Sequence, residues 1–321
     1  MTKILKLLLP LMLLGSSLLH AQEVRIASHV SALAPLYYQA KNFSSEVNKQ
    51  VKSKYDFKLF PNAQLGKEKA LITNLKAGSL EMIIVASGVL KLDKKLGIFD
   101  LPWIFKDREH VQRAMKAGLY DEIKNTIEKN SNNIKVLGIY ENGFRHIMNS
   151  KKAIITPKDL RGLKIRISGG KFRQDVFRKM GATPQKVAWK ETFTALQTGV
   201  VDGAEAATYG FYGQKHYEVL KHLSITNHIY TPSFLLVSKK FFNSLSKEDQ
   251  KIFEEVGKNI ADAQYKEAAK LERKYFKDMQ GKVSINNVNL PMFKKKVDKL
   301  YASYEKKFGK DWLKIINDTK E

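Results

Sequence analysis

Two arginines stand where predicted strands meet turns, and their chemistry suits an anionic ligand. Arg166 ends the segment 162–166 (GLKIR), and Arg145 ends the segment 143–145 (GFR) just after another predicted strand. Ligands of open α/β sheets bind at such strand ends. An arginine guanidinium offers a planar fork of N–H donors that matches a carboxylate, which a lysine does not. The alternative for Arg166 is a solvated charge on an edge strand. The alternation of apolar and charged residues over 163–166 does not by itself distinguish a ligand-binding arginine from such a surface charge.

Other chemistry-bearing motifs are absent from the sequence. There is no G-x-G-x-x-G or Walker phosphate loop, no G-x-S-x-G elbow, and none of the seven histidines falls in H-E-x-x-H spacing. The chain has no Cys, which excludes thiolate nucleophiles and thiolate metal sites. We therefore expect a protein that is not an enzyme and holds no metal and no cofactor.

The charge balance is strongly basic but dispersed. The formal net charge is +24, yet the longest pure lysine run is only 294–296. A nucleic-acid-binding protein would show a basic block or a recognisable motif, and neither is present. We expect no nucleic-acid partner and interpret the charge as a field that keeps the surface soluble and attracts anions.

The first 21 residues have the layout of a cleavable signal peptide. Lys3 and Lys6 precede a short apolar run over 7–14, and small residues lead to a predicted cleavage site after Ala21. The run is too short for a bilayer, which takes about 20 residues. Export of a chain that has no disulfides indicates the Gram-negative periplasm. We also expect the protein to be a monomer.

The rest of the chain alternates strands and helices, which predicts an α/β fold. The first half is predicted to contain strands at 24–28, 56–60 and 81–87 and helices at 36–47 and 67–77. The second is predicted to contain strands at 134–140, 163–168, 201–206, 224–237 and 283–288, helices at 171–180, 189–198 and 209–220, and two helices starting at Pro291 and Lys310.

A long helix is predicted over 246–279, opened by a Ser246/Asp249 capping box. The alternative is two helices broken near Gly257. Two α/β units without a flexible linker suggest a two-lobed clamp that closes by hinge bending, with the long helix as a spine across both lobes. We place lobe I at 22–142 plus about 232–271 and lobe II at 143–231 plus about 272–321.

An ordered set of motifs resembles the solute receptors of TRAP transporters. The set comprises QLG (64–66), FDLP (99–102), GFR (143–145), GLKIR (162–166), GATP (181–184) and VAWKETFTALQTGVVDGAE (187–205). The resemblance runs in order from about Val24 past Phe242. It implies a two-lobed periplasmic receptor that delivers a small organic acid to a membrane permease. The alternative is a periplasmic sensor that reports ligand to a membrane histidine kinase, built on the same clamp.

The resemblance also implies roles for individual residues. Arg166 matches the arginine that pairs bidentately with the ligand carboxylate, and Arg145 matches a neighbour that assists. Trp189 matches an aromatic residue that packs over the ligand. The remaining implied cleft residues are His29 and Ser87 on the lobe I side and Glu205 beside the cleft.

Two positions depart from the family pattern. An Asn commonly follows the acid, but here that position is Ala206, so a donor to the carboxylate is lost and Tyr209 or Thr208 would replace it. Ala86 stands where an acid would meet an ammonium group. We therefore expect a ligand without an amine: a hydroxy-, keto- or simple dicarboxylate.

Overall fold

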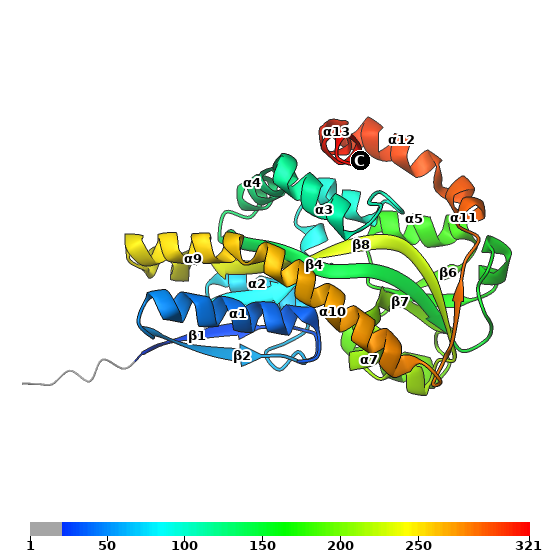
Figure 1. The fold of residues 1–321 in the computed structure, drawn as a ribbon, viewed down its shortest axis with the longest axis horizontal. Helices are drawn as coiled ribbons and strands as arrows, with labels where there is room; N and C mark the ends of the chain where they lie inside the picture. Colours follow the sequence, from blue (N-terminus) through cyan, green and yellow to red (C-terminus); the bar gives the residue numbers. More distant parts are fainter. Residues whose placement is uncertain (1–20) are drawn as a thin grey trace, which may run out of the picture.

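The computed structural model describes residues 21–321, and the predicted signal peptide lies outside this range apart from Ala21. Over the described residues, one mixed nine-stranded sheet has the order β2-β1-β3-β8-β4-β7-β5-β6, with β9 beside β8 (Figure 1). Two α/β units stand at the two ends of this sheet. The α/β, two-lobed architecture expected from the sequence is confirmed.

The first unit follows the expected order closely. It contains β1 (Gln22–Ala27), α1 (Pro35–Gln50), β2 (Tyr55–Phe60), α2 (Glu68–Ala77) and β3 (Met82–Val85). Both β2 and β3 run parallel to β1. Gly78 ends α2 with φ +68°, the left-handed conformation that glycine adopts without steric cost.

Two long antiparallel strands, β4 (Ile134–Asn149) and β8 (His222–Ser238), run through both units. The prediction that β4 ends at residue 140 is wrong. The strand continues through register shifts, one of them between Glu141 and Gly143, and Gly143 has φ +120°. Arg145 therefore lies within a strand and not in a turn after one. β-bulges keep the ladder while bending it, a feature that alternation of residue types does not reveal.

The second unit is built around β5 (Lys164–Ile167), which pairs in parallel with both neighbours. The predicted helix over 209–220 is present but too long, because α7 ends at Gly213 and a short 3-10 turn follows. The other elements here are α5 (Lys171–Met180), β6 (Thr183–Lys186), η5 (Trp189–Glu191), α6 (Thr192–Gln197), β7 (Gly203–Ala207), α7 (Thr208–Gly213) and η6 (His216–Glu218).

The spine consists of two helices, α9 (Lys247–Asn259) and α10 (Ala261–Met279), that meet at Ile260. The break lies three residues from Gly257, near the alternative considered above. Gly257 packs directly against the Leu137 carbonyl of β4, where a Cβ would collide. In Figure 1, α9 runs along the first unit and α10 continues across to the second.

Several helices connect and cover these units. Three C-terminal helices are present where two were predicted. The remaining elements are η1 (Val89–Lys91), η2 (Lys94–Asp100), α3 (Arg108–Ala114), η3 (Met115–Leu119), α4 (Tyr120–Asn130), η4 (Pro157–Leu160), α8 (Lys239–Ser244), β9 (Ser284–Asn287), α11 (Leu290–Val297), α12 (Lys299–Phe308) and α13 (Asp311–Asp318).

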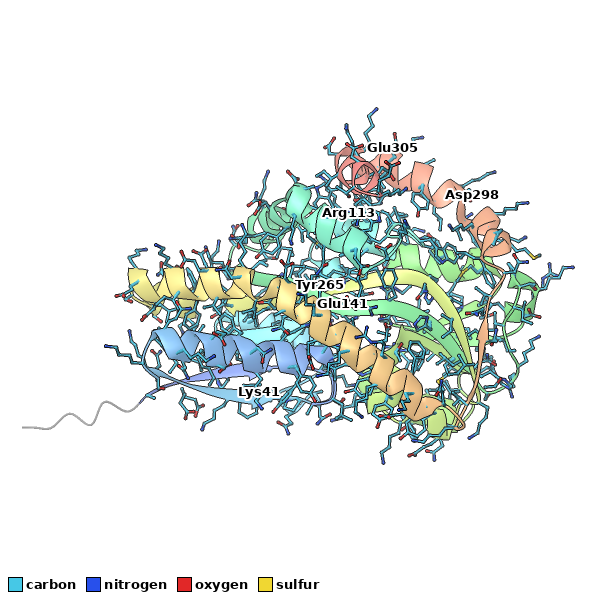
Figure 2. All side chains as sticks on the ribbon, in the orientation of Figure 1. Lys41, Arg113, Glu141, Tyr265, Asp298 and Glu305 are labelled. Carbon is cyan, nitrogen blue, oxygen red and sulfur yellow. The ribbon has the colours of Figure 1, made fainter. Side chains whose placement is uncertain are left out.

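The core is split by the sheet into two faces. On β4, Val136 packs into the cluster that contains Ile123 of α4, while its neighbour Leu137 packs into the cluster that contains Phe253 of α9. Successive strand residues point to opposite faces, so one strand serves both clusters. Around the outline of the molecule in Figure 2, in contrast, many side chains end in nitrogen or oxygen atoms.

The lobe boundaries predicted from the sequence meet at one place in the structure. Glu141 pairs with Pro232, and Gly143 pairs with Thr231, across the bulge between β4 and β8. The predicted breaks after residues 142 and 231 therefore fall side by side. The assignment of segments to lobes stays a prediction.

Candidate functional site

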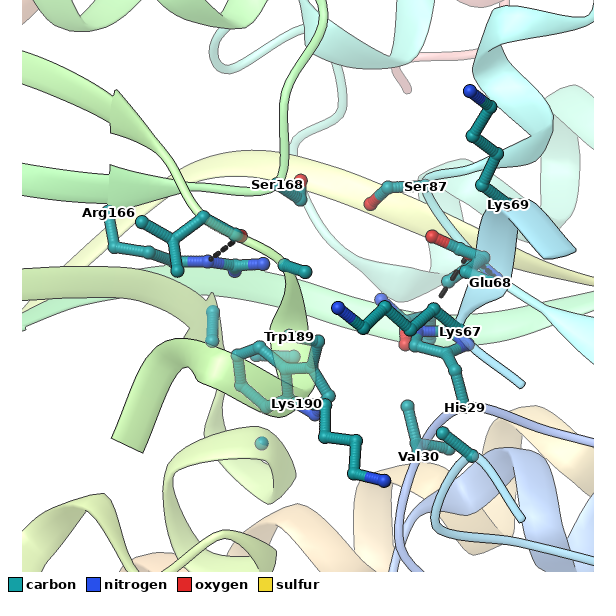
Figure 3. A pocket seen from close by; sticks show the side chains of 18 of the residues that line it. His29, Val30, Lys67, Glu68, Lys69, Ser87, Arg166, Ser168, Trp189 and Lys190 are labelled. Carbon is teal, nitrogen blue, oxygen red and sulfur yellow. Dashed lines mark hydrogen bonds and ion pairs between the residues drawn. The ribbon is translucent and has the colours of Figure 1, made fainter. Parts of the chain in front are cut away.

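A cavity of about 530 Å³ lies between the two units. Residues of α2 and of the segments that follow β1 and β3 line it on one side, and residues of β5, η5 and β7 line it on the other (Figure 3). Its size is in the range typical of small-molecule sites. Seven of the eight predicted site residues line it: His29, Ser87, Arg145, Arg166, Trp189, Ala206 and Tyr209.

Arg166 projects from β5 into this cavity and is only 2% exposed. Its Nε donates to the Val187 carbonyl at 3.0 Å, and its guanidinium carbon lies 5.0 Å from the centre of the Trp189 ring. Among the described residues, no acceptor faces its buried Nη1. Burial lowers the pKa of Arg166 to about 9, so the side chain stays cationic at neutral pH. A buried cation with an open donor is a ready anion site.

Arg145 lies beside this donor but is already neutralised. Its Nε pairs with the Glu205 carboxylate, and its Nη2 donates to the Glu205 carbonyl at 2.9 Å. Glu205 is fully buried behind the cavity and does not line it. Burial alone would raise the pKa of Glu205, but Arg145 and Arg173 outweigh it and hold the pKa well below its usual value. The geometry makes Glu205 the residue that holds Arg145 in place.

Arg173 is a buried arginine that the sequence reasoning missed. From α5 its Nε donates to Asp100 at 2.9 Å, and its Nη1 donates to Ser168 and, at 3.4 Å, to Ser87 of the cavity wall. The sequence does carry a signal for it. Positions 173, 176, 177 and 180 follow helical spacing, so Arg173 stands on the apolar stripe of α5. A charge on that stripe requires a buried partner, which Asp100 of the FDLP motif supplies.

Glu68 is a second missed residue, and it places a carboxylate in the cavity wall. It begins α2, and its Oε1 accepts from the Ala86 amide at 3.1 Å and lies 3.8 Å from His29 Nε2. Burial lowers the pKa of His29, which keeps this imidazole neutral at pH 7. Figure 3 shows Glu68 and His29 on the opposite side of the cavity from Arg166 and Trp189.

Five lysines also line the cavity: Lys67, Lys69, Lys91, Lys186 and Lys190. All five are exposed, and Lys67 pairs across the cavity with Glu191 of η5. Together with the two arginines they make seven cationic side chains against the single carboxylate of Glu68. The site therefore attracts anions from solution and concentrates them at its entrance.

A family model, described as bacterial extracellular solute-binding protein, family 7, matches residues 26–307. The chain belongs to this family. It is 30% identical over 270 residues to the 2,3-diketo-L-gulonate-binding periplasmic protein YiaO of Escherichia coli, covering 84% of this chain and 79% of the relative. The chain is thus a solute receptor by descent, as the resemblance implied.

Solved structures of TRAP periplasmic solute-binding proteins superpose closely on the chain. A TRAP periplasmic solute-binding protein from a Polaromonas species bound to D-erythronate has a TM-score of 0.89 at 29% identity, covering 94% of this chain and 99% of that one. A receptor from Haemophilus influenzae with L-gulonate has a TM-score of 0.87 at 28% identity, covering 93% and 100%. The two-lobed fold is therefore that of TRAP receptors.

Polar side chains share the cavity wall with Ala206, a position that departs from the family pattern. Ala206 lines the cavity without a polar group, and the neighbouring Tyr209 hydroxyl donates to the side-chain carbonyl of Asn142, which also lines the cavity. Thr208 does not line it and donates to Glu272 at 3.2 Å instead. Asn142, which sequence reasoning did not select, brings a side-chain amide to the cavity wall.

Within residues 21–321, no helix combines the length and apolar character that a membrane crossing needs. Nor does any group of three or more His, Asp or Glu side chains in the range have the arrangement of a metal site.

Proposed function

We propose that the protein captures a small organic carboxylate at Arg166 and delivers it to a TRAP-type membrane permease. The observation that carries this proposal is the buried Nη1 of Arg166, a cationic donor without an acceptor at the wall of a cavity between two lobes. A buried unpaired charge costs several kcal/mol, on the order of 3 or more, unless a partner arrives. A carboxylate ligand supplies that partner.

The ligands named for similar structures share the group that Arg166 would bind. D-erythronate, L-gulonate and succinate, the last in a Sulfurospirillum deleyianum receptor 27% identical to this chain, are all carboxylates. These structures are of TRAP receptors, which supports transport over the histidine-kinase sensor considered above. The carboxylate is the group that these three ligands share, and the rest of the molecule differs from one ligand to the next.

The remaining properties of the receptor follow the same proposal. The signal peptide is removed after Ala21, and the mature chain works in the periplasm as a monomer without turnover of its ligand. Arg166 pairs with the carboxylate, Arg145, held in place by Glu205, assists from beside it, and Trp189 covers it. Excluding water from this pair strengthens the electrostatic attraction.

Isothermal titration calorimetry with erythronate, gulonate and succinate tests the proposal. Arg166→Ala should weaken binding of every acid by about 2–5 kcal/mol, because it removes one partner of a buried charge pair. Arg166→Lys should also weaken it strongly, since the fork is lost. The matched control is Arg161→Ala, which removes an exposed arginine of the preceding turn. Unchanged affinity in folded Arg166→Ala protein contradicts the proposal.

A further inference from the structure

Gly210 lines the ligand cavity from within α7, at a place where the backbone does not require a glycine. The residue is helical, and its φ lies outside the left-handed region. Alanine stabilises a helix more than glycine does, because glycine loses more conformational freedom on folding. The reason for a residue without a Cβ at this position therefore lies in the space around it.

The space beside Gly210 is filled by the Trp189 indole. A Cβ on Gly210 would lie 3.0 Å from Trp189 Cη2, 3.1 Å from Trp189 Cζ2 and 3.3 Å from Ala206 Cβ. Carbon atoms in favourable contact are about 3.5–4.0 Å apart, so these distances are too short. Trp189 also packs against the apolar cluster that contains Ala206. The benzo edge of the indole therefore lies where it does because Gly210 and Ala206 are both small.

A second aromatic contact limits where the indole can move. The His216 ring packs edge-on against the Trp189 ring at 5.2 Å, is fully buried, and also contacts Phe193 and Phe211. Burial lowers the pKa of His216 to about 3, so this ring is neutral at pH 7 and packs as an aromatic side chain. Closely packed interiors yield little to displaced atoms. An indole that is pushed away from α7 therefore moves toward the cavity, which Trp189 lines.

We propose that Gly210 determines the size of the acid that the cavity accepts. Because Gly210 has no side chain, the Trp189 indole packs back against α7 and leaves room for a six-carbon acid whose carboxylate is bound by Arg166. Trp189 and Arg166 lie on the same side of the cavity (Figure 3). This inference rests on the proposed function and adds a limit on ligand size to it. Gly210 is a positioning residue, since it acts through Trp189.

The dimensions of the cavity agree with a ligand larger than a four-carbon acid. The cavity volume of about 530 Å³ is well above the lower end, about 300 Å³, of the range for small-molecule sites. The Arg166 guanidinium carbon lies 5.0 Å from the centre of the Trp189 ring, so an acid bound by Arg166 extends along the indole. A short acid can shift away from a displaced ring. A longer acid that fills the cavity has no space into which it can shift.

The test compares acids of different size. Calorimetry on the mature protein would use two four-carbon acids, erythronate and succinate, and the six-carbon gulonate. The parent protein should bind gulonate at least as tightly as erythronate. Gly210→Ala should weaken gulonate binding about 5-fold or more, and Gly210→Val about 10- to 100-fold, because added carbons overpack the site, while erythronate affinity stays within about 3-fold. Ala302→Val adds carbons at an exposed position of α12 and is the control.

A second substitution shows whether Gly210 acts through the indole. Trp189→Phe removes Cζ2 and Cη2, the two indole atoms nearest to a Cβ on Gly210. In that background, Gly210→Ala should change the ratio of gulonate affinity to erythronate affinity by less than about 2-fold, because a double-mutant cycle reveals coupling between residues in contact. A general loss of structure would instead weaken both acids in both backgrounds. Circular dichroism checks that each variant is folded.

The outcomes separate this inference from the proposed function. If Arg166→Ala abolishes binding but folded Gly210→Ala keeps the parent's ratio of gulonate to erythronate affinity, the role of Gly210 is wrong and carboxylate capture stands. The same selective loss with and without Trp189→Phe also overturns this role, as does a parent protein that binds a four-carbon acid but not gulonate. If none of the three acids binds, both the role of Gly210 and the carboxylate proposal are contradicted.

Discussion

The Arg166 guanidinium carbon lies 5.0 Å from the centre of the Trp189 ring, at cation–π distance. The Trp189 ring is itself fixed by contacts with neighbouring residues. A Cβ on Gly210 would be 3.0 Å from the indole, and the His216 ring packs edge-on at 5.2 Å. The orientation of the guanidinium is thus fixed by protein contacts before any ligand arrives. Such preorganisation reduces the entropy lost on binding.

The first prediction concerns the stability of the ligand-free protein. Arg166→Met should leave it unchanged or raise the free energy of unfolding by about 1–4 kcal/mol, because replacing a poorly paired buried charge with an apolar group is often stabilising. Urea unfolding of both proteins without ligand measures this. Trp189 keeps its contact with Gly210 in the variant, so the aromatic packing is preserved. A large loss of stability would show that Arg166 has a structural role of its own.

The second prediction concerns the buried pair of Arg173 and Asp100. Asp100→Ala should lower the free energy of unfolding by about 3–5 kcal/mol, because it leaves the fully buried Arg173 without its main partner. The control is Asp175→Asn on the same helix, which removes the exposed Lys171–Asp175 pair and should cost less than about 1 kcal/mol. Equal effects of the two substitutions in urea unfolding would contradict this account.

The third prediction is a pH dependence at Glu141, which lies in the interior beneath α10 in Figure 2. Burial raises the pKa of Glu141 from 4.5 to about 7 despite Arg108, while Glu272 and Glu109 add to the rise. The folded state then holds a proton that the unfolded state has lost between these two values. The contribution of Glu141 to the free energy of unfolding is therefore fully present below pH 4.5, and it is lost as the pH rises to about 7.

Glu141→Gln removes this titration and reveals it by difference. The free energy of unfolding of the parent minus that of the variant should fall by about 3 kcal/mol at most between pH 4.5 and 7, at about 1.4 kcal/mol per pKa unit. It should stay constant above that range. Urea unfolding at five pH values measures the difference, with Glu248→Gln as the control. Parallel curves for parent and variant would show that Glu141 is ionised throughout.

The elements of the first unit were predictable because their signals are local. α2 ends at Gly78 as expected, since a left-handed glycine terminates a helix regardless of its surroundings. α5 likewise spans 171–180 and ends at Gly181. In contrast, the continuation of β4 past residue 140 depends on pairing with β8, and no local pattern encodes a partner about 90 residues away.

For the site, the sequence by itself identified Arg166 as a candidate for binding a carboxylate. The order of its motifs, from QLG to the run that ends at Glu205, indicated the receptor family that the comparisons confirm. The alternation on β5 placed Arg166 on a strand, where it is found. These features follow from residue types and short spacings, which are properties of the sequence and do not depend on how the chain folds.

Only the tertiary structure decided which charges are free. Arg145 and Arg173 are buried arginines like Arg166, but Glu205 and Asp100 neutralise them, whereas Arg166 keeps an open donor. Glu68 is separated by 98 residues from Arg166 in the sequence, yet both line one cavity. Pairing between charges depends on distance and burial in the folded chain. The sequence shows that an arginine is present, and the fold determines whether it can take a ligand.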